Sequence, residues 1–243
     1  MLHVTNGDSA VPVVQQAVGA DALAWRDTLH DGPVPAAAPE ELRRVRARHL
    51  AARYGLDEPA ILAEMEARDA ALLAADAVVV WLEHDLYDQL QLLQLLQILW
   101  RRPDARAVVT DGFVTSYRPE ELRAMQPGAP DADAAAAAWA AFTGVDPNAW
   151  LAVRGDGVLR HVPAAFRRLA EELPWATDGL TRSQRALVGA GGDFAAAQRA
   201  EEAPFLGDAL AALLPESPSA WLGGVETARW RWDPERGVAS PAA

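Results

Sequence analysis

The sequence predicts an α/β protein, in which a three-layer, Rossmann-like parallel sheet precedes a smaller, mainly helical C-terminal domain. Helical stretches separate most of the short apolar segments in the first half, and strands that alternate with helices in this way form parallel sheets through right-handed crossovers. Proline and glycine near residues 127–130 then mark a change to helical patterns. The apolar segments predicted as strands are 2–5, 22–25, 77–82 and 107–110.

The helices between these strands are predicted from the helical spacing of their apolar residues. They are "VPVVQQAV" after the first strand, "PEELRRVRARHLAARYG" and "PAILAEMEARDAALLAA" after the second, and "DLYDQLQLLQLLQILW" after the third. In the last of these, Leu86, Leu90, Leu93 and Leu96 recur at spacings of three and four residues. This spacing predicts that the four leucines form a buried stripe, with Asp85 and Gln89 on another face.

The second half is predicted from three further helical patterns and a hairpin. "DADAAAAAWAAF" and "LRHVPAAFRRLAEEL" have apolar faces, and "LTRSQRALVGA" opens with Thr181 and Gln184 at the spacing of a capping box. "WLGGVETARWRWDPERG" alternates large and polar residues, as a strand or hairpin does. We therefore expect an α/β domain over 1–128, a helical connector over 129–176 and a C-terminal module over 177–243.

The composition restricts the possible functions. The 243 residues are 51% hydrophobic, which is enough to form a large core. They include no cysteine and no lysine, which excludes disulfides, thiolate and Schiff-base chemistry, and the lysine of a Walker loop. The net charge of -12 disfavours nucleic acids and anionic membranes as partners. We find no signal-peptide pattern and no apolar run of transmembrane length, so we expect a cytoplasmic protein.

Polar residues follow every predicted strand. In a parallel sheet the turns after the strands meet at one edge, where such folds bind their ligands. We expect catalytic residues among His30, His84, Asp85 and Asp27. Glu83 and Asp111 follow the third and fourth strands at the same edge. The residues that we expect to bind the ligand are Asn6, Gly7, Asp8, Ser9, Arg26, Asp31, Asp88 and Gln89.

Each of these residues also has a structural interpretation. Asp8 or Ser9 suits the cap of the following helix, and Asp85 suits the cap of the third helix, where the helix dipole would favour Asp88. The combination of two histidines with several carboxylates at one edge nevertheless favours a pocket. We therefore predict that six side chains surround one cleft, namely those of Asn6, Asp8, Arg26, His30, His84 and Asp85.

Three chemistries fit such a pocket. In the first, Ser9 is a nucleophile with His30 as its base and Asp27 behind it, because "GDS" and the D-x-x-H spacing partly resemble the GDSL-type hydrolases, although those carry D-x-x-H after the last strand. In the second, the histidines and carboxylates bind a divalent metal. In the third, helix N-termini and Arg26 bind a nucleotide or another anion. We predict that Ser9 is a helix cap or a ligand-positioning residue rather than a nucleophile.

The motifs "LHVTNGDSA", "WRDTLHDGPVP" and "VVVWLEHDLYDQLQLLQLL" together resemble the uncharacterised bacterial family catalogued as domain of unknown function 1835. The similarity continues through "AWAAF" and "FRRLAEELPWATDGLTRSQRAL" to "WLGGV" and "WRWDPERG". The resemblance implies that the three N-terminal motifs belong to one module, and that the second half contains a winged-helix-like unit. The stretch between "FLGDALAALL" and "WLGGV" is short for a complete wing. No established activity comes with the resemblance.

These observations lead to one preferred function and two alternatives. We expect a pocket for a small anionic or phosphorylated substrate, used for hydrolysis or group transfer, with a divalent metal as a candidate cofactor. The C-terminal module would cover this pocket or form a homodimer. The alternatives are a non-catalytic regulator that senses a ligand through the same pocket, and a structural interaction domain.

Overall fold

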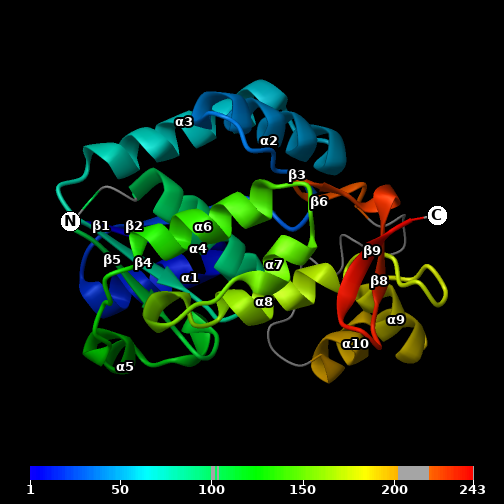
Figure 1. Ribbon diagram of the computed structural model, residues 1–243. Helices are drawn as coiled ribbons and strands as arrows, with labels where there is room; N and C mark the ends of the chain where they lie inside the picture. Colours follow the sequence, from blue (N-terminus) through cyan, green and yellow to red (C-terminus); the bar gives the residue numbers. More distant parts are fainter. Residues whose placement is uncertain (100–101, 103, 202–218, 243) are drawn as a thin grey trace.

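The computed structural model describes residues 1–99, 102, 104–201 and 219–242. Its central sheet has four strands, all parallel, in the order β2-β1-β4-β5 (Figure 1). The strands are β1 (Leu2–Asn6), β2 (Ala22–Trp25), β4 (Val78–Leu82) and β5 (Ala105–Val109). The predicted α/β class and the four predicted strands are therefore confirmed.

Helical crossovers connect the strands. The connections are α1 (Gly7–Val18) between β1 and β2, the hairpin of α2 (Pro39–Tyr54) and α3 (Glu58–Ala74) between β2 and β4, and α4 (Leu86–Leu99) between β4 and β5. The chain thus moves from β1 to one neighbour, β2, and then crosses to the other neighbour, β4. This reversal puts the topological switch point of the sheet between β1 and β4.

Helices cover both faces of the sheet, because successive side chains of a strand point to opposite faces. Val79 and Trp81 of β4 belong to the apolar cluster on the side of α1, whereas Val80 and Leu82 belong to the large core on the side of α4. The other helices of these two layers are α5 (Pro119–Ala124) beside α1, and α6 (Ala132–Thr143) and α8 (Val162–Ala170) beside α4.

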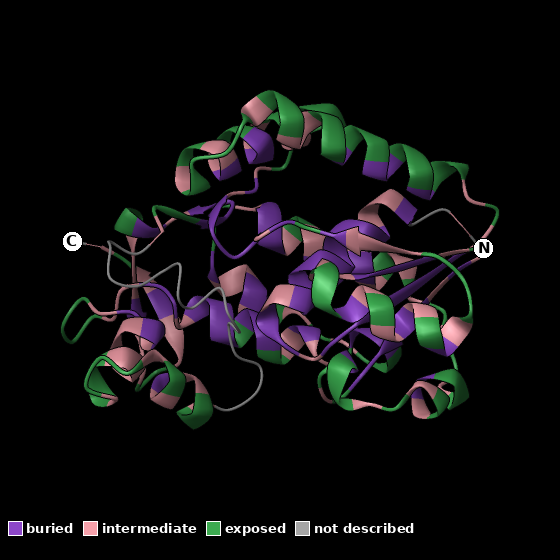
Figure 2. Cartoon of the chain, turned by 180° about the vertical axis from the view of Figure 1, so that it is seen from behind, coloured by how far each residue is buried: buried purple, intermediate pink, exposed green. Residues whose placement is uncertain are grey.

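Helix α4 is the central helix of the protein. The predicted stripe is confirmed, since Leu86, Leu90, Leu93 and Leu96 are at most 2% exposed. Gln89 and its neighbours on the other sides of the helix are buried as well. The reason is that α6 and α8 also pack against α4, so protein surrounds the helix. Figure 2 shows this contrast between the buried centre and the largely exposed outer helices.

The large core continues from the sheet into the second half of the chain. It includes Phe142 of α6 and Phe166 of α8, and also Trp232 near the C-terminus. Between these helices lie α7 (Asn148–Ala152) and a short 3-10 turn at Gly157–Leu159, and two further 3-10 turns are at Val114–Ser116 and Thr227–Arg229.

Within its described residues, the C-terminal part combines helices with antiparallel strands and is not mainly helical, which corrects the sequence-based expectation. Its described helices are α9 (Arg182–Gly189), which begins with the predicted capping box of Thr181 and Gln184, and α10 (Phe194–Ala200). The described residues from 219 onward form antiparallel pairs, as predicted for the alternating sequence of this segment. The pairs are β6 (Trp221–Gly223) with β7 (Val225–Glu226), and β8 (Trp230–Asp233) with β9 (Val238–Pro241).

The C-terminal strands also reach back to the first half. Strand β3 (Gly32–Pro33), which follows β2 in the chain, pairs in parallel with β6. The motif "FLGDALAALL", on which the winged-helix expectation depends, lies outside the described residues. Among the helices that the structure describes, none is both long and apolar enough to cross a membrane.

Candidate functional site

The site is built at the switch point, where the carboxyl ends of β1 and β4 meet. Asn6 ends β1, and Asp88 lies in the first turn of α4. Asn6 Nδ2 donates a hydrogen bond of 2.7 Å to Asp88 Oδ1. Gly7 has a φ of 41°, which favours glycine and lets the chain turn directly from β1 into α1. The first and third polar turns of the sequence therefore meet, as predicted.

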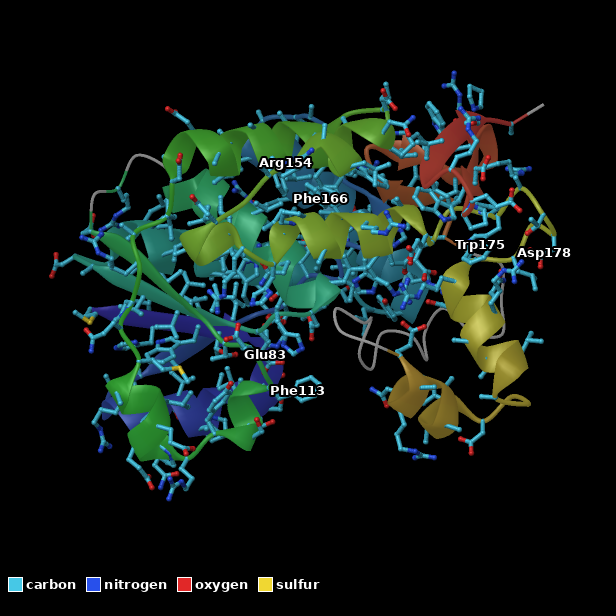
Figure 3. The ribbon with its side chains drawn as sticks, turned by 60° about the horizontal axis from the view of Figure 1, so that its bottom comes forward. Glu83, Phe113, Arg154, Phe166, Trp175 and Asp178 are labelled. Atoms are coloured by element: carbon cyan, nitrogen blue, oxygen red, sulfur yellow. The ribbon has the colours of Figure 1, made fainter. Side chains whose placement is uncertain are left out.

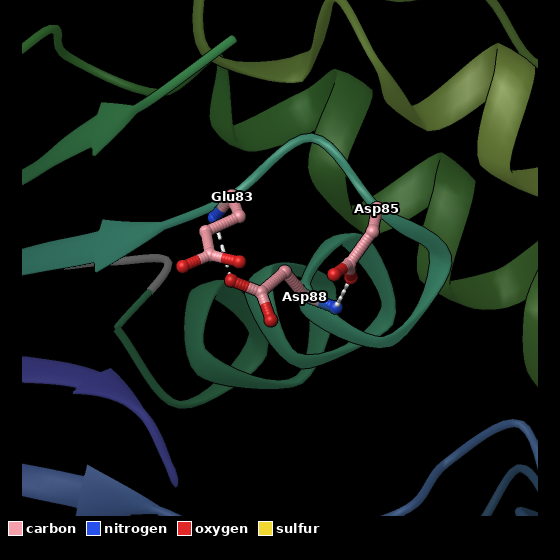
Figure 4. A group of neighbouring side chains, drawn as sticks. All are labelled: Glu83, Asp85 and Asp88. Atoms are coloured by element: carbon pink, nitrogen blue, oxygen red, sulfur yellow. Dashed lines mark hydrogen bonds between the residues drawn. The ribbon is translucent and has the colours of Figure 1, made fainter. Parts of the chain in front are cut away.

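Three carboxyl groups come together beside Asn6, and we call Glu83, Asp85 and Asp88 the acidic triad (Figure 4). One oxygen of each lies within 4.8 Å of the others, and the three residues are at most 5% exposed. Backbone groups hold them in place. Asp88 Oδ2 accepts from the N–H of Glu83, Asp85 Oδ1 accepts from the N–H of Asp88, and Glu83 Oε1 accepts from the N–H of Val114.

The acidic triad has no cationic partner in the part of the chain that the structure describes, since its donors are backbone N–H groups and the Asn6 amide. Burial, with a contribution from the charge of Asp85, raises the pKa of Glu83 to about 7. Burial also raises the pKa of Asp85 to about 6. The pKa of Asp88 is raised well above its ordinary value by burial and by its two acidic neighbours. The carboxyl groups of the triad therefore keep their protons to a higher pH than ordinary carboxyl groups do.

Gln89 supports the triad from the next position of α4. Its Nε2 donates a hydrogen bond of 2.6 Å to the carbonyl oxygen of Glu83. Asp85 has the position of the α4 cap, since it accepts from the N–H three residues later and its carbonyl accepts from the N–H of Gln89. The predicted role of Asp85 as a helix cap is thus confirmed. The capping hydrogen bond also holds its carboxylate within the acidic triad.

A second group of polar side chains lies beside the triad, and we call His84, His161, Asp111 and Arg160 the histidine cluster. The rings of His84 and His161 are 6.0 Å apart between centroids. Asp111 Oδ1 lies 2.9 Å from His161 Nε2 and accepts a 2.8 Å hydrogen bond from Arg160. The loop after β5 joins the two groups, because Val114 N–H bonds Glu83 and the Phe113 ring contacts His84. Figure 3 shows Glu83 and Phe113 at this end of the sheet.

The histidine cluster combines opposite charges with a neutral imidazole. The hydrogen bond from Arg160, assisted by His161, lowers the pKa of Asp111. Burial and the neighbouring His161 lower the pKa of His84, although Asp111 opposes this shift. His84 is therefore neutral at pH 7, and its ring can accept a proton. Its Nδ1 is buried and has no hydrogen-bond partner among the described residues.

Asp8 and Ser9 lie at the start of α1 and are exposed. Asp8 pairs with Arg26, which also pairs with Glu64. Ser9 is not a helix cap, because α1 begins two residues earlier, at Gly7, and Asn6 has the capping position without a side-chain bond to the helix. Strand β1 runs directly into α1, so Ser9 lies within the first turn of the helix and not in a loop before it.

The serine, histidine and aspartate of the hydrolase alternative do not form a hydrogen-bonded triad among the described residues. Asp27 is fully buried in an ion pair with Arg46, with N···O distances of 2.8 Å and 2.9 Å, and it accepts from Gln94 Nε2. His30 is also buried, and neither ring nitrogen has a partner among the described residues. Asp27 therefore does not orient His30. Without that contact, His30 is not held as the base that the serine hydrolase alternative requires.

His30 and Asp31 have contacts of their own, and we find no hydrogen bond or ion pair among the described residues that joins them to the acidic triad. Burial lowers the pKa of His30 to about 4, so its ring is neutral, and it packs edge-on against Tyr87 of α4. Asp31 lies close to His49 and Arg53, at 3.5 Å and 3.2 Å. The one cleft predicted for six side chains is thus divided: Asn6, His84 and Asp85 gather at the switch point, the pair of Asp8 and Arg26 is exposed, and His30 is in the core.

Sequence reasoning missed three residues of these networks. Arg160 and His161 lie directly before α8, in the predicted connector and far in sequence from the strand ends. The sequence marks them only as a polar pair in front of an amphipathic helix. Arg46 has no local signal, because it is one of five arginines in α2. Its partner Asp27 was expected to be catalytic, although the structure uses it to neutralise Arg46.

The chain was compared with protein-family models, with curated proteins and with solved structures. None of these comparisons returns a match.

Proposed function

We propose that the protein binds a divalent cation at the acidic triad and uses it to bind and hydrolyse a small phosphorylated substrate, or to transfer its phosphoryl group. The observation that supports this proposal is the burial of three carboxyl groups within 4.8 Å of one another, with no cationic partner in the described chain. Burying such like charges without compensation is costly, and a cation removes that cost.

The chemistry of the triad favours Mg²⁺ or Mn²⁺. Both are hard cations that prefer oxygen ligands, and Glu83, Asp85 and Asp88 offer carboxylate oxygens. A bound cation of this kind lowers the pKa of water and neutralises the charge of a phosphate. The position also suits the proposal, since ligands of open parallel sheets bind at the switch point.

The histidine cluster and α1 supply the remaining groups. Arg160 is part-exposed and is suited to contact phosphate oxygens, while the N-terminus of the 12-residue helix α1 favours a negative charge. His84, neutral at pH 7, is the candidate general base that takes the proton from the attacking water or hydroxyl. The motifs that resemble domain of unknown function 1835 contain the acidic triad, Asn6 and His84, and membership of that family is part of this proposal.

The first experiment measures cation binding. We expect Mn²⁺, titrated in a calorimeter, to bind the purified protein and to raise its thermal unfolding temperature. The stabilisation is larger at about pH 8 than at about pH 5.5, because protons on Glu83 and Asp85 compete with the metal as the pH falls through 7 and 6. Asp88→Asn abolishes Mn²⁺ binding, whereas Glu66→Gln, an exposed change on α3, preserves it.

The second experiment measures turnover of p-nitrophenyl phosphate and its diester with Mg²⁺ or Mn²⁺. Cation-dependent hydrolysis supports the proposed enzymatic function if His84→Gln reduces its rate at least tenfold. Mn²⁺ binding without turnover of phosphate esters or of phosphoryl donors favours the ligand-sensing alternative instead. No Mn²⁺ binding at millimolar concentration and about pH 8 rejects the metal site itself.

A further inference from the structure

A partly open cavity of about 150 Å³ is lined by residues of the α2–α3 hairpin and of the central helices α4 and α6. Figure 1 shows the hairpin lying above α4 and α6. No member of the acidic triad or of the histidine cluster lines the cavity. It is therefore a different place from the site proposed above.

The polar side of this cavity has more positive than negative groups. Three arginines and two aspartates line it, so only two carboxylates are available to compensate three guanidinium charges. Arg46 pairs with Asp27 at 2.8 Å, while Arg43 and Arg68 both pair with Asp69, at 2.9 Å and 3.3 Å. Burial lowers the pKa of Arg68, as expected for a cation that lacks a carboxylate of its own.

Other acidic groups near these arginines are exposed to water. Glu40 lies 4.0 Å from Arg43 at the start of α2, and its side chain is 65% exposed. Glu64, which is near Arg68, pairs with Arg26 and is also exposed. Water screens both charges, so they compensate the buried arginines only weakly.

Two buried donors on this wall have no acceptor among the described residues. They are Arg43 Nε of α2 and Gln97 Nε2 of α4, and both residues line the cavity. A buried donor without an acceptor costs free energy, so such groups are usually satisfied by something that enters the space beside them. Unsatisfied donors on two residues that line one cationic cavity favour an oxygen-bearing anion.

Apolar side chains line the cavity as well. Leu42 of α2, Met65 of α3, Ile98 of α4 and Trp139 of α6 line it. An apolar cavity of about 150 Å³ is large enough for a benzene molecule. The space therefore suits a molecule that has one charged end and one compact apolar end.

We propose that this cavity binds a small organic carboxylate with a compact aromatic or branched aliphatic body. The carboxylate oxygens accept hydrogen bonds from the Arg43 and Gln97 side chains, and the body packs against Met65, Ile98 and Trp139. The inference does not rest on the proposed function, because it uses none of the residues of the acidic triad. It gives the α2–α3 hairpin a role as the wall of a second ligand site.

The test uses benzoate as the probe, titrated into the full chain in the presence of a metal chelator. We expect saturable binding, and we expect benzamide, which has nearly the same shape without the charge, to bind at least tenfold more weakly. Inorganic phosphate, which lacks an apolar body, is also expected to bind at least tenfold more weakly. Equal affinity for benzamide would refute the role of the arginines in binding. Equal affinity for phosphate would refute the role of the apolar residues.

Two pairs of variants locate the binding. Arg43→Gln weakens benzoate binding about 10- to 100-fold, because it removes a charge-assisted hydrogen bond, whereas Arg44→Gln, on the next position of α2, has no effect. Ala37→Phe blocks the cavity from its exposed edge, and Ala36→Phe, also exposed but not lining the cavity, does not. Absence of benzoate binding to the folded wild-type chain, or binding that Ala37→Phe leaves unchanged, refutes the proposal.

Discussion

Asp85→Asn tests whether the acidic triad is a cation site or only a helix cap. The substitution preserves the shape of the side chain, and its remaining oxygen still accepts from the N–H of Asp88. It removes one of three buried negative charges. We therefore expect the cap to survive while the repulsion within the triad decreases and cation binding is lost.

The effect of Asp85→Asn on stability follows from its pKa. Folding raises this pKa from 3.8 to about 6, so the folded protein holds more protons than the unfolded chain between these values. Without metal, wild-type stability consequently falls as the pH rises from about 4 to about 6. The shift corresponds to about 3 kcal/mol at most, so we expect the metal-free variant to equal or exceed the wild type by up to that amount at about pH 8.

The assay is urea unfolding of both proteins at about pH 4 and about pH 8, with a chelator and with Mn²⁺. The two proteins should differ little at the lower pH, where Asp85 is protonated in the folded protein and still partly protonated in the unfolded chain. At the higher pH, Mn²⁺ should stabilise only the wild type. Asp8→Asn, at an exposed carboxylate near the same strand ends, should retain the Mn²⁺ effect. A loss of more than about 2 kcal/mol in Asp85→Asn with Mn²⁺ binding intact would refute this reasoning and make the residue structural.

Three further predictions concern residues outside the triad. Leu93→Ala in α4 should lower the free energy of unfolding in urea by about 2–5 kcal/mol and leave the Mn²⁺ affinity unchanged. Leu93→Met should lower it by less than about 1.5 kcal/mol. A small loss of stability in the alanine variant would contradict the packing of α4. Ser9→Ala should preserve both stability and turnover, and covalent labelling of Ser9 by a fluorophosphonate would contradict its assignment as a non-nucleophile. Arg46→Ala leaves Asp27 buried without its cation, so it should cost about 3–5 kcal/mol, and adding Asp27→Asn should recover part of this; a cost near zero would mean that water reaches Asp27.

Much of the fold could be predicted from the sequence because its signals are local. The strand β4 is an apolar run that is buried along its whole length, and α4 repeats leucines at helical spacing. Thr181 and Gln184 cap α9 within four consecutive residues. Parallel strands then carry their turns to one edge, and for this reason Asn6, Asp85 and Asp88 were predicted to meet.

The mainly helical C-terminal domain was the wrong part of that prediction. The helical patterns before residue 200 are real, and the alternating residues after 219 form the predicted strands. The parallel pairing of β6 with β3, about 190 residues earlier in the chain, was not predicted. Contacts of such high sequence separation leave no periodicity in either segment. They depend on how the intervening elements pack.

The sequence by itself determined which residues lie at the carboxyl edge, since residue type, helical or strand period and turn chemistry are properties of short segments. Only the tertiary structure decided what each residue does there. It paired Asp27 with Arg46, placed His30 in the core and brought His161 and Arg160 to Asp111 from the connector. The physical reason is that charge compensation and burial are properties of the space around a side chain, and that space is formed by elements far apart in the chain.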